Sequence, residues 1–340
     1  MATVIEAIDA AIANKNPPSV GRRYLGCSQI GEECERKLWY SFHWSVATQW
    51  EPRMVRLLSR GHNEETLLNG YLKDADIEVH DVDEDTGEQW EFSACGGHLL
   101  GHADGFVRNL PDSPEWHLLE EKTANQKSFD RTKKLGVEAD KPIHYSQMQI
   151  YMYLADLSFA AYLVVNKNTD ELYFERVPAN KKHAESLLAK ADRIIASSEP
   201  PERMSEDPTF FKCSWCDYRE ICHYDASPEA NCRTCAHSTP ERDGDARWVC
   251  EKHQTDLSIE AQRKGCEDHL FIPALLNTWA TLLDAGEDWI GYENKKTGAK
   301  FANGKDYYTS YEIAACNDVK MLGDQTINEL RQTFGGKITG

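Results

Sequence analysis

Apolar and polar positions between residues 99 and 124 predict two strands joined by a loop that contains Pro111 and Pro114. The second strand, WHLLEEKT, begins with largely apolar residues and then carries two carboxylates and a lysine. Strand side chains alternate between faces, so Glu120 and Lys122 should point the same way and Glu121 the other. If the first strand pairs alongside the second, Asp104 can join Glu120 and Lys122.

The remaining periodicity predicts helices over residues 3–14, 55–72 and 178–197 and strands in FAAYLVVNK and ELYFERV. The acidic, turn-rich residues 73–91 are expected to form a peripheral hairpin, and the polar residues 123–142 a mobile segment over the site. Strands, a crossing helix and further strands in this order predict an α/β fold, with a mixed central sheet flanked by helices.

At 340 residues the chain is longer than one typical domain. No apolar run approaches the roughly 20 residues of a membrane span, and the amino terminus lacks a basic region before an apolar core, so we expect a cytoplasmic protein without a membrane partner. A net charge of -18 argues against a broadly basic, DNA-binding surface. Any DNA would have to bind in a local groove. Candidate phosphate contacts are Arg22, Arg23, Arg36, Lys37, Arg53–Arg60, Lys133, Lys134, Lys181 and Lys182.

Two carboxylates beside one ammonium suit a hard divalent cation and an attacking water, and therefore metal-assisted phosphodiester chemistry. The alternative is a charged edge strand, in which Asp104 and Gly105 merely form a turn. The apolar run directly before Glu120 favours a buried strand that reaches the surface at a site.

Asp104 followed by Glu120-x-Lys122 resembles the core signature of the PD-(D/E)XK nucleases. Gln147 and Tyr151, four residues apart in HYSQMQIYMYL, resemble the QxxxY motif of the RecB-type exonuclease branch of that superfamily. That spacing places both side chains on one helix face. The resemblance covers about residues 20–225 and implies a restriction-endonuclease-like core.

The resemblance implies a metal-dependent DNA exonuclease of recombination, repair or phage DNA processing, in a bacterial cell or a phage-infected host. In this family Asp104, Glu120 and the backbone carbonyl of Glu121 would hold Mg or Mn, and Lys122 would position the water. Gln147 and Tyr151 would contact the substrate near the scissile phosphate. A recombinase, helicase or single-strand-binding protein is a possible partner. The rival hypothesis is a catalytically silent DNA-binding or scaffolding protein on the same fold.

Residues 55–72 carry Gly61 followed closely by histidine and glutamate, which resembles the first motif of the family. Glu65 is the first choice for an auxiliary metal ligand or water-binding group, and His62 or Glu64 is the next. An exposed charged helix face is an equally simple interpretation.

Eleven cysteines without a signal peptide indicate metal binding in a reducing compartment. Cys213, Cys216 and Cys222 supply three soft ligands that need a fourth, which suits zinc or an iron-sulfur cluster. The spacing resembles that of the iron-sulfur RecB-like nucleases, AddB and CRISPR-associated members among them, in which a distant amino-terminal cysteine completes a 4Fe-4S cluster. The resemblance assigns that position to Cys34, in CERKLWY, with Cys27 as the alternative.

A second set, Cys232, Cys235, Cys250 and Cys266, predicts a zinc site of ribbon or knuckle type. His253 or His269 could replace either of the last two cysteines. A structural or recruiting role is favoured over catalysis, because such a site stabilises a short segment that lacks a core.

The predicted organisation is a nuclease domain with an iron-sulfur staple at 1–225, a zinc-ribbon or knuckle-like module at 226–270, and a small C-terminal region of unknown role at 271–340. Aromatic residues interleaved with lysines in the C-terminal region could stack on single-stranded bases, although core aromatics of strands are the simpler interpretation. Cys95 and Cys316 are expected to be small buried residues.

Overall fold

A computed structural model describes residues 3–242 and 244–339. The chain divides into two compact units. The first comprises Met1–Pro18, Tyr24–Glu32 and Gln49–Asp192, and the second comprises Ser19–Arg23, Glu33–Thr48 and Arg193–Gly340. The segment predicted as the nuclease domain, 1–225, therefore contributes to both units.

The first unit is built on a five-stranded mixed sheet, which confirms the predicted α/β class. The strand order is β2-β5-β6-β7-β8, where β6 and β7 are parallel and the other neighbours are antiparallel. A smaller sheet has the order β1-β4-β3. The strands of the unit are β1 (Leu25–Gly26), β2 (Glu78–His80), β3 (Trp90–Ala94), β4 (Leu99–Ala103), β5 (Gly105–Arg108), β6 (His117–Ala124), β7 (Phe159–Asn166) and β8 (Leu172–Pro178).

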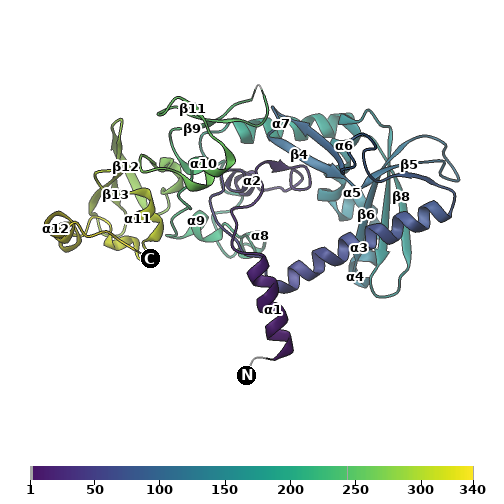
Figure 1. Ribbon diagram of the computed structural model, residues 1–340, viewed down its shortest axis with the longest axis horizontal. Coiled ribbons are helices and arrows are strands. Elements are labelled where there is room, and N and C mark those ends of the chain that lie inside the picture. Colours follow the sequence, from purple (N-terminus) through teal and green to yellow (C-terminus); the bar gives the residue numbers. More distant parts are fainter. Residues whose placement is uncertain (1–2, 243, 340) are drawn as a thin grey trace. The chain divides into compact units, whose positions relative to one another are not determined.

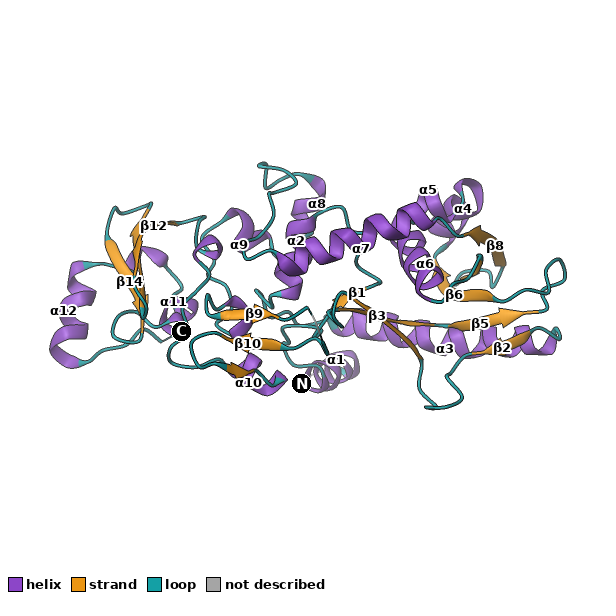
Figure 2. Cartoon of the chain, turned by 90° about the horizontal axis from the view of Figure 1, so that it is seen from above, coloured by secondary structure: helices purple, strands orange, loops and turns teal. Residues whose placement is uncertain are grey.

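Helices cover both faces of the five-stranded sheet. The long helix α3 (Pro52–Asp74) runs along the strands (Figures 1 and 2), and its Leu68 packs against Leu163 and Val165 of β7. On the opposite face, Gln147 of α6 (Pro142–Leu154) reaches Glu120 of β6. Side chains of β6 thus alternate between α6 and α3. The other helices are α1 (Val4–Lys15), α4 (Gln126–Leu135), α5 (Val137–Asp140) and α7 (Lys181–Ala196), the last of which continues past the end of the first unit.

The first predicted strand of the hairpin is broken at Asp104. Residues before the break form β4, which pairs with β1 and β3, and residues after it form β5, which pairs with β6. Gly105 allows the break because it has a φ of +151°, and an added Cβ would lie 2.8 Å from the carbonyl oxygen of His80. Asp104 therefore sits at the fork between the two sheets.

Two predicted elements are wrong. Residues 73–91 form no hairpin, because β2 pairs with β5 and β3 pairs with β4. Residues 123–142 are not an irregular segment but end β6 and form α4 and α5, since Asn125 caps α4 by accepting a hydrogen bond from the Ser128 amide, and Phe129 and Val137 anchor α4 and α5 in the core.

In the second unit, a buried arginine fastens the cysteine-rich module, residues 226–270, to the segment around α2 (Glu35–Phe42). Arg233 is 1% exposed and stacks on Trp44 at 3.7 Å. Its guanidinium donates to the carbonyl oxygens of Phe42 and Arg23. The further elements here are α8 (Phe211–Ser214), α9 (Arg219–His223), η1 (Cys232–Thr234), β9 (Ser238–Pro240), β10 (Trp248–Cys250), β11 (Thr255–Asp256) and α10 (Ile259–Lys264).

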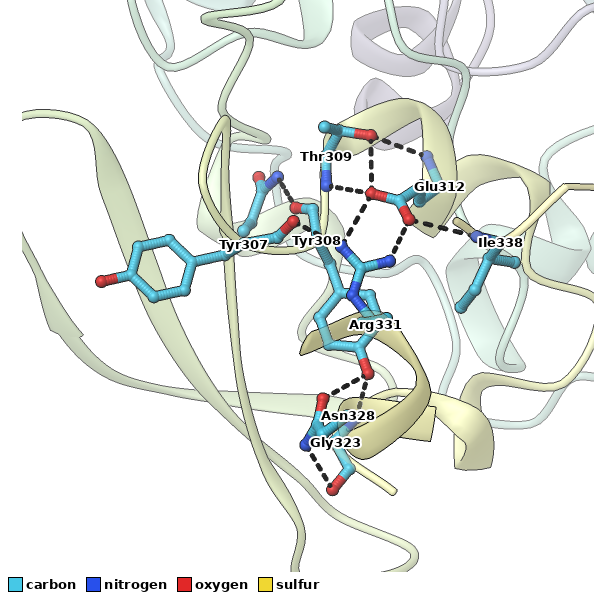
Figure 3. A network of polar contacts seen from close by, with 9 residues as sticks. Tyr307, Tyr308, Thr309, Glu312, Gly323, Asn328, Arg331 and Ile338 are labelled. Carbon is cyan, nitrogen blue, oxygen red and sulfur yellow. Dashed lines mark hydrogen bonds and ion pairs between the residues drawn. The ribbon is translucent and has the colours of Figure 1, made fainter. Parts of the chain in front are cut away.

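The C-terminal module, residues 271–340, has its own core beneath an antiparallel sheet with the order β12-β13-β14. Trp279, Tyr292 and Phe301 are buried, as predicted for most of these aromatics. Figure 3 shows how Arg331 ties the last helix to the rest through Glu312. The elements are η2 (Pro273–Leu275), β12 (Ala280–Ala285), β13 (Trp289–Asn294), β14 (Lys300–Gly304), α11 (Ser310–Ala315), η3 (Val319–Met321) and α12 (Gln325–Phe334).

Among the described residues, none of the helices combines the length and the apolar character that crossing a membrane requires.

Candidate functional site

The fork at Asp104 gathers the predicted carboxylates and lysine. Pairing of β5 with β6 ends at Leu119, so the next part of the β6 edge is open to Asp104. The Glu121 amide donates to Asp104 Oδ2 at 2.7 Å. Lys122 Nζ lies 2.5 Å from Glu120 Oε1 and 3.4 Å from Asp104 Oδ2, and it donates to the Glu121 carbonyl oxygen at 2.9 Å. Asp104, Glu120 and Lys122 thus converge.

Burial and charge set the protonation of this group. Glu120 is fully buried, and burial, reinforced by Asp104 and opposed by Lys122, raises the pKa of its carboxyl to about 7. Burial alone would lower the pKa of Lys122, but the neighbouring Asp104 and Glu120 raise it above its usual value. The lysine therefore stays an ammonium and acts as a hydrogen-bond donor.

Glu121 lies on the opposite face of β6, and its side chain is 2% exposed. Within the described residues neither of its carboxylate oxygens has a hydrogen-bond partner. Burial and the nearby charges of Asp104 and Glu65 raise the pKa of this carboxyl to about 9. Sequence reasoning gave a role only to the backbone of Glu121. The sequence feature that could have predicted its buried side chain is the pair of consecutive glutamates in a buried strand, because one of the two side chains must point to each face of the sheet.

On α3, the structure turns Glu65 rather than His62 toward the fork. The negative charge of Glu65 acts on both Glu120 and Glu121. His62 is 75% exposed and lies 3.5 Å from Glu65. Glu64 pairs instead with Arg60, one helical turn away, at 3.4 Å.

Gln147 and Tyr151 share one face of α6 but contact different parts of the site. Gln147 Nε2 donates to Glu120 Oε2 at 3.3 Å. The Tyr151 hydroxyl donates to the carbonyl oxygen of His102 at 3.0 Å, and its side chain is 1% exposed. Tyr151 thus packs behind the fork, against β4, where an added Cβ on Gly101 would lie 2.3 Å from its hydroxyl. A contact between Tyr151 and substrate would require this hydrogen bond to break.

The sequence reasoning missed His144 and Tyr162. Tyr162 of β7 is the register partner of Glu120, and its hydroxyl lies 2.9 Å from His144 Nδ1. Burial, together with the positive charge of Lys122, lowers the pKa of His144 to about 3. The ring is therefore neutral. The sequence feature that could have revealed His144 is its position three residues before Gln147, because that spacing places both side chains on one side of α6.

Four cysteines of the first predicted cluster lie together in the second unit. Cys34 is the N-cap of α2, Cys213 lies in α8, Cys216 follows it, and Cys222 lies in α9. Burial raises the pKa of the Cys213 thiol, and Cys222 and Cys34 raise it further because they are close enough to interact. Cys27 belongs to the first unit, where it is buried against Gly101.

Cys232, Cys235, Cys250 and Cys266 line one small cavity of the cysteine-rich module, together with His253 and His269. Ligand atoms of His253, Cys266 and Asp268 all lie within 4.8 Å of one another. His269 is buried, and its Nε2 is 2.8 Å from the carbonyl oxygen of Asn231. His253 therefore lies closer than His269 to the position that a ligand in place of Cys266 would occupy.

The fold and the site together are a mixed sheet with two carboxylates and a lysine at the open edge of a strand. A family model described as the PD-(D/E)XK nuclease superfamily matches residues 27–223, and the chain belongs to that superfamily. This confirms the superfamily to which the sequence motifs pointed.

Comparison with curated proteins returns no match. Among solved structures, the chain is similar to the crystal structure of SSO0001, with 15% identity, 65% of this chain and 96% of that chain covered, and a TM-score of 0.38. It is also similar to LHK-Exo in complex with dAMP, with 15% identity, coverage of 56% and 91%, and a TM-score of 0.37. A further similar structure is the alkaline exonuclease LHK-Exo from Laribacter hongkongensis, with the same identity and coverage and a TM-score of 0.35.

Proposed function

We propose that the protein is an Mg- or Mn-dependent DNA exonuclease of the RecB-type branch, with a role in recombination, repair or phage DNA processing. The observation that supports the proposal best is the convergence of Asp104, Glu120 and Lys122 at the fork. Gln147 is hydrogen-bonded to Glu120 at the same place. A nuclease site that no longer catalyses cleavage would be expected to have lost one of these groups.

The donor set fits a hard divalent cation. Asp104, Glu120 and the carbonyl oxygen of Glu121 are oxygen ligands of the kind that Mg and Mn prefer. Glu65 supplies a further negative charge from α3. A cation bound there would polarise the scissile phosphate and lower the pKa of an attacking water.

The protein's own groups orient the reactants. Lys122 is held by Glu120 and the Glu121 carbonyl oxygen and makes a longer hydrogen bond to Asp104 Oδ2, so the proton of this longer bond could be donated instead to the nucleophile or to a phosphate oxygen. Gln147 fixes the Glu120 carboxylate, and His144 with Tyr162 packs beside it as a neutral pair. We assign substrate contact to Gln147, with Tyr151 reaching the substrate only after it leaves His102.

Two further metal centres belong to this proposal. A 4Fe-4S cluster on Cys34, Cys213, Cys216 and Cys222 would staple the start of α2 to residues 213–222, and the interaction among these thiols supports it. Zinc on Cys232, Cys235, Cys250 and Cys266, or on His253 in place of Cys266, would stabilise the cysteine-rich module. We propose that this module recruits a recombinase, helicase or single-strand-binding protein, and that the functional division is 1–225, 226–270 and 271–340.

The decisive experiment is cleavage of end-labelled linear DNA and of circular DNA in Mg or Mn. We expect nucleotides to be released from linear DNA, and the circle to stay intact. Glu120→Gln should abolish release, whereas the control Glu64→Gln, at a half-buried position paired with Arg60, should not. Absence of cleavage with either metal would favour the silent DNA-binding alternative. Cutting of the circle would indicate an endonuclease.

A further inference from the structure

The C-terminal module contains a cavity of about 660 Å³ that the nuclease site does not use. It lies between the sheet and the last helix, and is lined on one side by β13 and β14 and on the other by α12. The floor near Tyr308 is closed by the network in Figure 3, where Arg331 stacks over the Tyr308 ring at 4.2 Å and pairs with Glu312. The cavity is thus bounded by fixed groups.

Two aromatic side chains of the cavity wall remain outside the core. The Trp289 indole lies across glycine backbone, since an added Cβ would be 2.4 Å from its Nε1 at Gly286 and 3.0 Å from its Cζ3 at Gly291. Tyr307 is 48% exposed, and its ring centroid is 6.2 Å from that of Trp289. Figure 3 shows the Tyr307 ring turned away from the Arg331–Glu312 network. Both rings can therefore offer a face to a ligand.

Exposed lysines line the same cavity as these two rings. Lys300, Lys305 and Lys337 line the cavity, as do Asp284 and Asp306. In the part of the chain that the structure describes, Lys300 and Lys337 form no ion pair with an acidic side chain, while Lys305 lies 3.4 Å from Glu267. The charges of Arg331 and Glu312 offset each other, because the two side chains form an ion pair. The two lysines without an ion pair are matched in number by Asp284 and Asp306, so the cavity lining is close to neutral in a chain of net charge -18.

We propose that this cavity is a binding site for single-stranded DNA, in which Trp289 and Tyr307 stack on bases and Lys300 and Lys337 contact the backbone phosphates. Stacking needs unpaired bases, because the faces of paired bases are already occupied by their neighbours in the duplex. The proposal rests on the proposed function, since an exonuclease that degrades linear DNA exposes such strands.

The test measures binding rather than cleavage. Anisotropy of a fluorescein-labelled oligothymidine is titrated with Glu120→Gln protein in buffer without divalent cations, and a blunt hairpin duplex serves as the second probe. Stacking contributes roughly 1–3 kcal/mol per base. Trp289→Leu and Tyr307→Leu should each therefore weaken oligothymidine binding at least about fivefold, with duplex binding unchanged.

Matched controls come from the same module. Phe334 is 78% exposed and does not line the cavity, so Phe334→Leu should bind like the parent. Lys300→Gln with Lys337→Gln should flatten the dependence of log affinity on log salt by about 1.4, at roughly 0.7 per single-strand phosphate contact. Lys320→Gln should leave the slope unchanged. Circular dichroism verifies that Trp289→Leu is folded, and Tyr307→Leu repeats the test at an exposed position.

Unchanged oligothymidine affinity in folded Trp289→Leu and Tyr307→Leu would overturn the site, and so would an equal loss for duplex. If the wild-type chain also cleaved linear DNA, the proposed function would stand without this site. Failure of cleavage in Mg and Mn, with stacking still detected, would instead refute the nuclease proposal.

Discussion

Replacing the buried Glu121 by glutamine should change how stability depends on pH. The Glu121 carboxyl has no hydrogen-bond partner among the described residues, and burial with nearby negative charge raises its pKa to about 9 from the usual 4.5. The folded protein therefore holds this proton more tightly than the unfolded chain does. Its contribution to stability is fully present below pH 4.5 and is lost as the pH rises toward 9.

The magnitude follows from the size of the shift. Each pKa unit corresponds to about 1.4 kcal/mol, so the wild-type protein should lose about 3 kcal/mol of unfolding free energy from this group between pH 4.5 and pH 7. Glu121→Gln carries no titrating group. The stability of Glu121→Gln relative to wild type should therefore increase by about 3 kcal/mol over the same interval.

The assay is urea unfolding, followed by tryptophan fluorescence at pH 5, 6 and 7. Divalent cations are removed with a chelating resin on the buffer rather than by EDTA, so that cysteine-bound metals are kept. The control Glu64→Gln, on α3 beside Arg60, should follow the wild-type pH dependence. Parallel pH dependences for wild type and Glu121→Gln would refute the reasoning, because the buried carboxyl would then have the same pKa in both states.

Manganese provides a second readout on the same variants. A cation bound at Asp104 would offset one of the charges that raise the pKa of Glu121, so the difference between wild type and Glu121→Gln should shrink at pH 7. It should not vanish, since burial is the larger cause of the raised pKa. A difference that Mn leaves unaltered would place the cation away from Asp104.

Three further predictions concern the other parts of the molecule. Asp104→Ala should abolish cleavage while the circular dichroism spectrum stays that of the wild type, because relief of the repulsion among the crowded carboxylates offsets the loss of the hydrogen bond from the Glu121 amide. Cys34→Ala should bleach the broad visible absorption expected of anaerobically purified protein and make it sensitive to protease, whereas Cys27→Ala should keep the colour. Arg233→Met should lower the unfolding free energy by about 3 kcal/mol in urea titrations. The substitution leaves two buried acceptors, the carbonyl oxygen of Phe42 and the side-chain oxygen of Gln262, without their hydrogen-bond donor.

Local sequence pattern predicted the parts of the site that depend on local geometry. Strand alternation placed Glu120 with Lys122, and helical spacing placed Gln147 and Tyr151 on one face of their helix. The break at Asp104 was beyond such reasoning, because it depends on β4 pairing with β1 and β3, which lie elsewhere in the sequence. The two helices within 123–142 contain too few apolar residues to show a helical spacing of hydrophobic positions. Asn125 could nevertheless have predicted the start of a helix, because asparagine is a common N-cap residue.

The break in the strand also explains why the acidic groups meet. An open strand edge normally leaves amide groups unpaired, and here Asp104 accepts the hydrogen bond of the Glu121 amide that β5 no longer covers. The carboxylate that completes the edge is thereby fixed beside Lys122 and between two further glutamates on opposite faces of β6. Among the described residues, Lys122 is the cation whose charge acts on Glu120 and Glu121, while Asp104 and Glu65 add negative charge, so the fork is short of positive charge. A divalent cation bound at the proposed site would offset these crowded carboxylates and stabilise the folded protein, so metal affinity would be coupled to folding there.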